Sequence, residues 1–238
     1  MGNPSEIRSR VSRLPLTISQ SYLIHAVRPV LVDVGLTRDE SRVLSWLDHQ
    51  GVAPHEPGAI VLTHAHADHA GAIAAIAQRA RVPVIVGAAD VPTLRNGGEA
   101  RWHRKKGLGR TFARLGLLQA YPPLPGGVDV VPVSDVLSLD PFGAKATVFP
   151  VSGHTPGSIA VVLASGEAMV GDMVIGGYLL GRVGRARPVS HYFHADRARN
   201  LASLNALLDT GAHTWHLGHG GPLTAAAIRS WLRRSPRG

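Results

Sequence analysis

The chain has 238 residues, of which 45% are hydrophobic and 17% are charged, values typical of a soluble globular protein with a sizeable core. It contains no cysteine, which excludes disulfide bonds, thiolate catalysis and sulfur ligands for a metal. No apolar run is long enough to cross a bilayer, and residues 1–13 lack the apolar stretch of a secretory signal. We therefore expect a cytoplasmic protein without membrane contact.

The formal net charge of +9 points to anionic partners or substrates. Much of this charge lies between Arg95 and Arg114, a segment that includes Arg101. Nucleic acids could bind there through their phosphates, but the aromatic residues that stack on bases make up 5% of the chain. We interpret most of the charge as a solvated basic surface and expect an anionic small-molecule substrate rather than a nucleic acid.

The first half of the chain alternates buried apolar runs with helix-forming segments. Helices are indicated where apolar residues recur three or four positions apart, as at Ile73 and Ile76. In chain order we expect a strand at 16–24, a strand at 29–34, a helix at 38–49, a strand at 59–62, a helix at 71–80 and a strand at 82–86. This order predicts a βαβ unit around the strand at 59–62.

The pattern breaks between about residues 99 and 127, which are first basic and then rich in proline and glycine. We expect a variable insert there, a short helix followed by a loop. Beyond it we expect strands at 128–133, 146–151, 159–163 and 167–170, a helix at 196–209, a strand at 214–217 and a helix at 225–234. Repeats and linkers are absent from the sequence, so residues 1–238 are expected to form a single domain.

The densest group of chemically active side chains directly follows the strand at 59–62. The segment Thr-His-Ala-His-Ala-Asp-His contains His64, His66, Asp68 and His69. Imidazole and carboxylate are ligands that zinc and neighbouring divalent metals favour. Because the carboxyl end of a strand is the usual place for a site in α/β sheets, the sequence predicts a metal site at this position.

Four more candidate residues occur in short motifs elsewhere. Asp33 follows the apolar residues 30–32 within the expected strand at 29–34, and His154 lies in Gly-His-Thr-Pro-Gly. Asp172 follows a glycine after the strand at 167–170, and His219 stands between glycines. A Gly-Asp pair is by itself common turn chemistry, so each motif alone has an ordinary explanation.

Together and in this order, the motifs resemble those of the metallo-β-lactamase superfamily of metal-dependent hydrolases, and the likeness covers nearly the whole chain. The resemblance implies an α/β fold, the four-layer αβ/βα sandwich, with the motif loops meeting at one edge of the paired sheets. It also implies a centre of two divalent metal ions. We expect Zn²⁺, with Mn²⁺ and Fe²⁺ as alternatives.

The resemblance further implies a role for each motif residue. The ligands of the first metal would be His64, His66 and His154. Those of the second would be Asp68, His69 and His219. Asp172 would bridge both ions, Asp68 would also orient the attacking metal-bound hydroxide, and Asp33 would support the ligands through hydrogen bonds.

Other histidines and two tyrosines are weaker candidates. His216 lies inside the expected strand at 214–217, so we interpret it as a packing residue. His191 and His194 are expected as surface-loop residues, although they could touch substrate. Speculative substrate contacts are Tyr178, Tyr192 and Arg101.

Within the superfamily, true β-lactamases generally lack a bridging aspartate, so Asp172 favours the branch of glyoxalase-II-type thioesterases and lactonases. We therefore expect a metal-dependent hydrolase of a carboxylic ester, lactone or thioester. Two alternatives stay open. One is a phosphodiesterase or nuclease of the same fold, which the positive charge favours. The other is a mononuclear iron oxidoreductase that resembles persulfide dioxygenases.

Overall fold

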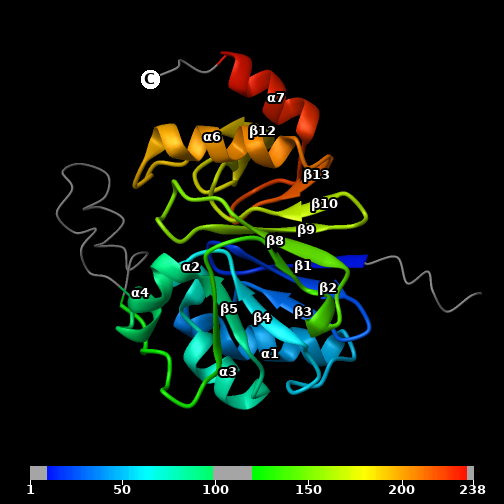
Figure 1. The fold of residues 1–238 in the computed structure, drawn as a ribbon, viewed down its shortest axis with the longest axis vertical. Coiled ribbons are helices and arrows are strands. Elements are labelled where there is room, and N and C mark those ends of the chain that lie inside the picture. Colours follow the sequence, from blue (N-terminus) through cyan, green and yellow to red (C-terminus); the bar gives the residue numbers. More distant parts are fainter. Residues whose placement is uncertain (1–9, 99–119, 235–238) are drawn as a thin grey trace, which may run out of the picture.

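A computed structural model of the chain describes residues 10–98 and 120–234. Two six-stranded sheets pack against each other, and helices cover the outer face of each sheet, as Figure 1 shows. This is the four-layer αβ/βα sandwich expected from the sequence. Residues 99–119 of the expected insert, with Arg101 among them, lie outside the described residues.

Residues 10–133 supply the strands of the first sheet. Its strands, in sheet order, are β1 (Arg10–Pro15), β2 (Gln20–His25), β3 (Val30–Val32), β4 (Ala59–Leu62), β5 (Val84–Gly87) and β6 (Val130–Val133). The first three strands pair antiparallel, and β3 to β6 run parallel. Parallel neighbours need crossover connections, which here contain η1 (Thr37–Asp39), α1 (Glu40–His49), α2 (Ala67–Ala70), α3 (Ile73–Ala80), η2 (Ala88–Asp90) and α4 (Val91–Arg95).

Strand β4 shows why the central strands are apolar throughout. Ile60 and Leu62 pack in the core beneath the helices, whereas Ala59 and Val61 pack in the core between the two sheets. Side chains alternate across a strand, so burial of both faces makes every residue of β4 buried. A register slip would exchange the two cores, so the packing fixes where the chain leaves the sheet after Leu62.

The second half of the chain forms the second sheet. Its strands, in sheet order, are β14 (Leu223–Thr224), β13 (Thr214–His216), β10 (Glu167–Met169), β9 (Ile159–Leu163), β8 (Ala146–Pro150) and β7 (Leu137–Ser138), with η4 (Asp140–Phe142) between β7 and β8. The helices α6 (Arg197–Leu208) and α7 (Ala225–Arg234) lie over its outer face (Figure 1). Leu204 of α6 and Ile228 of α7 share a core with Trp215 of β13.

The start of the first sheet differs from the expected strand at 16–24. The chain turns between Leu16 and Ser19, where the N–H of Leu16 donates to the carbonyl of Ser19, and this turn separates β1 from β2. β1 is an edge strand with arginines at Arg10 and Arg13 and largely exposed or half-buried residues. Charged residues are common on edge strands. In β1 they interrupt the alternation of apolar and polar residues by which a strand is predicted.

Two further differences lie near the motif loops. The helix expected at 71–80 begins at Ile73 as α3, and a separate helical turn, α2, precedes it from Ala67 to Ala70. A hairpin of β11 (Ile175–Tyr178) and β12 (Val183–Val189) forms a separate two-stranded sheet that the sequence did not indicate. β12 is mostly exposed and carries glycine, arginine and proline, so it has no apolar alternation to recognise.

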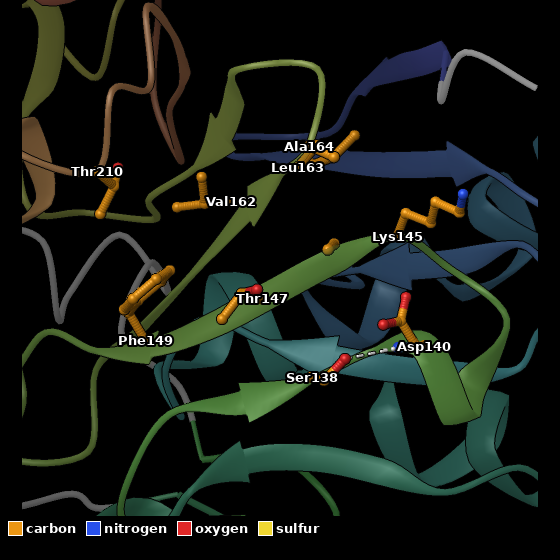
Figure 2. A pocket seen from close by; sticks show the side chains of 10 residues that line it. Ser138, Asp140, Lys145, Thr147, Phe149, Val162, Leu163, Ala164 and Thr210 are labelled. Carbon is orange, nitrogen blue, oxygen red and sulfur yellow. Dashed lines mark hydrogen bonds between the residues drawn. The ribbon is translucent and has the colours of Figure 1, made fainter. Parts of the chain in front are cut away.

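Figure 2 shows a pocket on the outer face of the second sheet, lined among others by Lys145, Thr147, Phe149 and Val162. Phe149 and Val162 also pack against the core beneath α6 and α7. The residues lining this pocket include none of the predicted ligands, so it is separate from the candidate site. Across residues 10–98 and 120–234, no helix is long and apolar enough to span a membrane.

Candidate metal centre

The predicted ligands come from four loops that follow strands of the two sheets. His64 and His66 lie directly after β4, and Asp68 and His69 lie on α2, the single helical turn that follows. The other three are His154 between β8 and β9, Asp172 between β10 and β11, and His219 between β13 and β14. The sandwich thus brings together residues that are as far apart in the sequence as 64 and 219.

One group of possible ligand atoms contains the predicted first-metal residues. The ligand atoms of His64, His66 and His154 lie within 4.8 Å of one another. Nδ1 of His66 is 3.0 Å from Nε2 of His154, and the ring of His64 is nearly perpendicular to both others. Three nitrogen atoms facing one point could hold a divalent metal ion.

A second group contains the predicted second-metal residues and Asp172. Its ligand atoms, from Asp68, His69, Asp172 and His219, also lie within 4.8 Å of one another. Nε2 of His219 is 3.2 Å from Oδ2 of Asp68 and 3.3 Å from Oδ2 of Asp172. The Asp172 carboxylate is also 3.7 Å from Nε2 of His154 and 3.9 Å from Nε2 of His64, so it lies between the two groups.

Buried atoms without hydrogen bonds show that the cluster fits a metal. Within the described part of the chain, Nε2 of His64, Nε2 of His69 and Oδ1 of Asp172 are buried without a hydrogen bond, and the last two face each other over 3.5 Å. Leaving such atoms unsatisfied costs about 1–3 kcal/mol each. A divalent ion would satisfy all three, because imidazole nitrogen and carboxylate oxygen are its usual ligands.

Hydrogen bonds on the outer side of the rings orient these histidines. Nδ1 of His69 lies 2.8 Å from Oδ2 of Asp33, Nδ1 of His154 lies 2.8 Å from the carbonyl oxygen of Phe193, and Nδ1 of His219 lies 2.7 Å from that of Ile18. An acceptor at Nδ1 holds a proton there, so Nε2 is the nitrogen that faces the cluster. In all three rings, Nε2 is therefore the atom available to a metal.

Asp33 is hydrogen-bonded both to the end of β4 and to a predicted ligand. It lies just after β3 with a positive φ of 57°, and its carboxylate accepts hydrogen bonds from the N–H and the hydroxyl of Thr63, each over 2.8 Å. The same carboxylate accepts a hydrogen bond from Nδ1 of His69 over 2.8 Å. Asp33 thus ties the end of β4 to a predicted ligand on α2.

A second buried carboxylate, Asp90, plays a comparable part and was not predicted. It accepts hydrogen bonds from the N–H of Ala65 over 3.0 Å, the hydroxyl of Thr155 over 2.8 Å and the N–H of Gly157 over 2.9 Å. Ala65 separates the first two histidines of the motif, and Thr155 follows His154. Because Asp90 stands alone in an unremarkable sequence, no local signal identifies it.

Residue 218, next to the second group of ligand atoms, has room only for a glycine. A Cβ atom there would collide with Oδ1 of Asp172 and would lie 2.5 Å from Cε1 of His69. The backbone before His219 therefore lies so close to the second group that it leaves no room for a side chain. The glycine next to the late histidine in the sequence reflects this close approach.

The electrostatics of the first group favour neutral imidazoles. Burial and the neighbouring rings hold the pKa of His64 and of His154 well below the ordinary value. Burial lowers the pKa of His66 to about 4, although Asp68 and Asp172 act in the opposite direction. These three side chains are neutral at physiological pH and need lose no proton to bind a metal.

The second group behaves in the opposite way. Burial disfavours the charged ring of His219, but Asp172 and Asp68 outweigh it and raise its pKa to about 10. The same two carboxylates, with Asp33, raise the pKa of His69 well above the ordinary value against the effect of burial. Burial would raise the pKa of Asp172, yet His219 and His69 hold it well below its usual range. In the metal-free protein this group is therefore a network of imidazolium and carboxylate ions.

His191 corrects the expectation of a surface-loop residue. It is buried, and its Nε2 lies 3.3 Å from Oδ2 of Asp172. His194 is farther out, with its ring centre 5.6 Å from that of His154 and its Nε2 3.4 Å from the hydroxyl oxygen of Ser190. The polar sequence around His191 gave no sign of this burial.

The remaining predicted residues that the structure describes belong to neither of the two groups. Tyr178 on β11 is 53% exposed, and the hydroxyl of Tyr192 accepts a hydrogen bond from the N–H of Leu179 over 3.2 Å. Their contact with substrate stays a prediction, and Arg101 lies outside the described residues. Nε2 of His216 is 3.0 Å from Oε1 of Glu167, a sheet contact that agrees with the packing role expected for it.

Known proteins share both the sequence pattern and the fold. A family model of the metallo-beta-lactamase superfamily matches residues 14–219. The chain is 28% identical over 217 residues to "Probable metallo-hydrolase YflN" of Bacillus subtilis (strain 168), and this alignment covers 85% of the chain and 79% of that protein.

Solved structures agree with this match. TTHA1623 in a di-iron-bound form has a TM-score of 0.64 and 28% identity, with 92% of this chain and 96% of that chain covered. The BLEG-1 B3 metallo-beta-lactamase has a TM-score of 0.67 at 21% identity, with 93% and 97% covered, and shows the shared fold. Since the family model extends over most of the sequence and the fold is the same, the chain belongs to the metallo-beta-lactamase superfamily.

Proposed function

We propose that the chain is a dinuclear metal-dependent hydrolase that cleaves a carboxylic ester, a lactone or a thioester. The observation that carries this proposal is the position of Asp172. Its carboxylate lies 3.5 Å from Nε2 of His69 and 3.7 Å from Nε2 of His154, one residue from each ligand group. A carboxylate has two oxygens, so in this position it would hold two cations at once.

The ligands in this proposal are those expected from the motifs. His64, His66 and His154 would hold one ion, Asp68, His69 and His219 would hold the other, and Asp172 would be shared by both. Two divalent ions would supply a nucleophile from water at neutral pH and would polarise the scissile carbonyl. Nitrogen and oxygen ligands suit Zn²⁺, which we propose, and the di-iron-bound form of TTHA1623 makes iron the first alternative to test.

Asp68 is the residue that we propose to orient the attacking water. Its side chain is 11% exposed, whereas that of Asp172 is 2% exposed, so Asp68 is the one of the two that reaches solvent. Burial would raise the pKa of Asp68, but His69 and His219 lower it below its usual value. Asp68 is therefore ionised at neutral pH and can accept a hydrogen bond from water.

A phosphodiesterase of the same fold is the second candidate. Arg185 and Arg187 on the exposed strand β12 favour it, because guanidinium groups bind phosphate well. We prefer acyl substrates because the chain has few aromatic residues to stack on bases, and we propose that an anionic small molecule uses these arginines instead. The mononuclear iron alternative needs one ion and gives the second ligand group no role.

The decisive experiment is a substrate panel at matched metal loading. Protein reconstituted with Zn²⁺, Mn²⁺ or Fe²⁺ is assayed with p-nitrophenyl acetate, a lactone, a thioester and bis-p-nitrophenyl phosphate, at low and high salt. We expect kcat/KM for an acyl substrate to exceed that for the phosphodiester. A phosphodiester advantage that collapses with salt would overturn this preference, and thiol-dependent O₂ uptake with one iron per chain would support the oxidoreductase.

A further inference from the structure

The loop after β12 is hydrogen-bonded to the loop that carries His154. The N–H of Ala195 donates to the carbonyl of His154 over 3.0 Å, and the N–H of Asp196 donates to that of Gly153 over 2.9 Å. These backbone bonds hold the segment 190–196 against one of the metal-site loops. The position of His191 is therefore fixed by backbone hydrogen bonds of its loop.

The side chain of His191 faces the cluster. Its Nε2 is 3.3 Å from Oδ2 of Asp172, and the ligand atoms of His154, Asp172 and His191 lie within 4.8 Å of one another. The ring centre of His191 is 4.6 Å from that of His154, with the two planes nearly perpendicular. A third group of three possible metal ligands thus overlaps the two groups already described.

The carbonyl oxygen of Phe193 orients both His154 and His191. It lies 2.8 Å from Nδ1 of His154 and 3.0 Å from Nδ1 of His191. An acceptor on Nδ1 leaves the lone pair of Nε2 facing the cluster, which is how ligand histidines are usually supported. His191 is held in the same way as His154, by the same atom.

One competing arrangement exists for the His191 ring. The N–H of Phe193 is 3.1 Å from the same Nδ1 and could donate to it. Nε2 would then carry the proton and could donate to Asp172 or to an oxygen of a substrate. A cation at the cluster disfavours this arrangement, because it would repel an N–H group directed toward it and attract a lone pair.

We propose that His191 is a further protein ligand of the metal centre, alongside His154 and Asp172. This inference rests on the proposed metal centre and adds a nitrogen ligand that the family motifs do not contain. The additional ligand raises the number of protein atoms around one ion. It should therefore suit a divalent first-row metal that accepts more than four ligands.

The test compares His191→Ala with His213→Ala, a matched change at an exposed histidine that contacts Thr214 and Ser165. Metal content after dialysis, chelator competition with Zn²⁺ and the visible spectrum of the Co²⁺-loaded protein are measured. We expect His191→Ala to weaken binding of one ion by about 10–100-fold or more. We also expect stronger Co²⁺ absorption, as coordination number falls, and no change in His213→Ala.

Unchanged Zn²⁺ affinity together with an unchanged Co²⁺ spectrum in His191→Ala would overturn the inference, even if activity fell, and would make His191 a substrate contact. Wild-type protein that binds no metal would instead contradict the proposed function. Circular dichroism and thermal unfolding establish that each variant is folded. If His191→Ala does not fold, His191→Gln, which keeps the side-chain volume closer, is compared by the same measurements and the same criteria.

Discussion

The carboxylate of Asp90 accepts a hydrogen bond from the hydroxyl of Thr155 over 2.8 Å. Asp90 follows β5 in the first half of the chain, whereas Thr155 lies between β8 and β9 in the second half. Two backbone N–H groups, those of Ala65 and Gly157, donate to the same carboxylate. This one buried side chain therefore fixes the spacing between the two loops that carry the first ligand group.

We expect Asp90→Ala to lower the free energy of unfolding by about 1–3 kcal/mol or more, because three buried donors lose their acceptor. The loops should also become less well placed, so affinity for the first metal should fall by about 10–100-fold. Urea unfolding of metal-free protein and chelator competition measure the two effects. Asp48→Ala, at an exposed position on α1, is the control. Equal unfolding energies for Asp90→Ala and wild type would show that water replaces the carboxylate.

Asp172→Ala should lower metal occupancy and abolish hydrolysis while leaving the fold largely intact. Asp172 is buried between the two ligand groups, and without it two cations would lose a shared negative charge. Elemental analysis of protein purified without chelator should give two metals per wild-type chain and fewer in the variant. A variant that keeps both metals and most activity would show that Asp172 does not bridge. Asp209→Ala, at an exposed site after α6, controls for loss of a carboxylate.

His216 and His219 form a matched pair for testing the second ligand group. Both lie near the end of β13, but Nε2 of His219 is 3.3 Å from Asp172, whereas that of His216 is 3.0 Å from Glu167. His219→Ala should lose the second metal, and His216→Ala should retain it. Retention of two metals by His219→Ala, or their loss from His216→Ala, would contradict the ligand assignment.

The fold and the motif loops could be predicted because their signals are local. Four apolar residues end at Leu62 and are followed at once by the histidine cluster, so the strand and the site are adjacent in sequence. The resemblance then supplied the order of the distant motifs. β1 was not predicted, because an edge strand needs little apolar surface. Its arginines interrupt the alternation of apolar and polar residues that indicates a strand.

The roles of Asp90 and His191 could not be predicted because they depend on contacts between distant segments. Asp90 meets Ala65 and Thr155, which are 25 and 65 residues away in the chain. His191 is buried because its loop is hydrogen-bonded to His154, and its own sequence, Ser-His-Tyr-Phe-His, is polar enough to suggest a surface. These contacts form only when the sandwich is packed, and no repeating pattern of residues in the sequence predicts them.

Binding of the second metal should release protons, because its histidines are protonated in the metal-free protein. Asp172 and Asp68 overcome the effect of burial and raise the pKa of His219 to about 10, and the pKa of His69 is raised as well. A metal needs the neutral ring, so both histidines lose a proton on binding at about pH 7.5. Affinity for the second ion should therefore increase as the pH rises toward the pKa of His219.

Calorimetric titration with Zn²⁺ at about pH 7.5, in two buffers of different ionisation enthalpy, measures this release. The heat of the second binding event should differ between the buffers, because each buffer takes up the displaced protons with its own enthalpy. The first event should show little difference, since the pKa of His64 and of His154 lies well below 6.5 and these rings are already neutral. In His219→Ala, which should not bind the second metal, the buffer-dependent binding event should disappear. Equal heats in both buffers throughout the titration would mean that His69 and His219 are neutral before the metal binds.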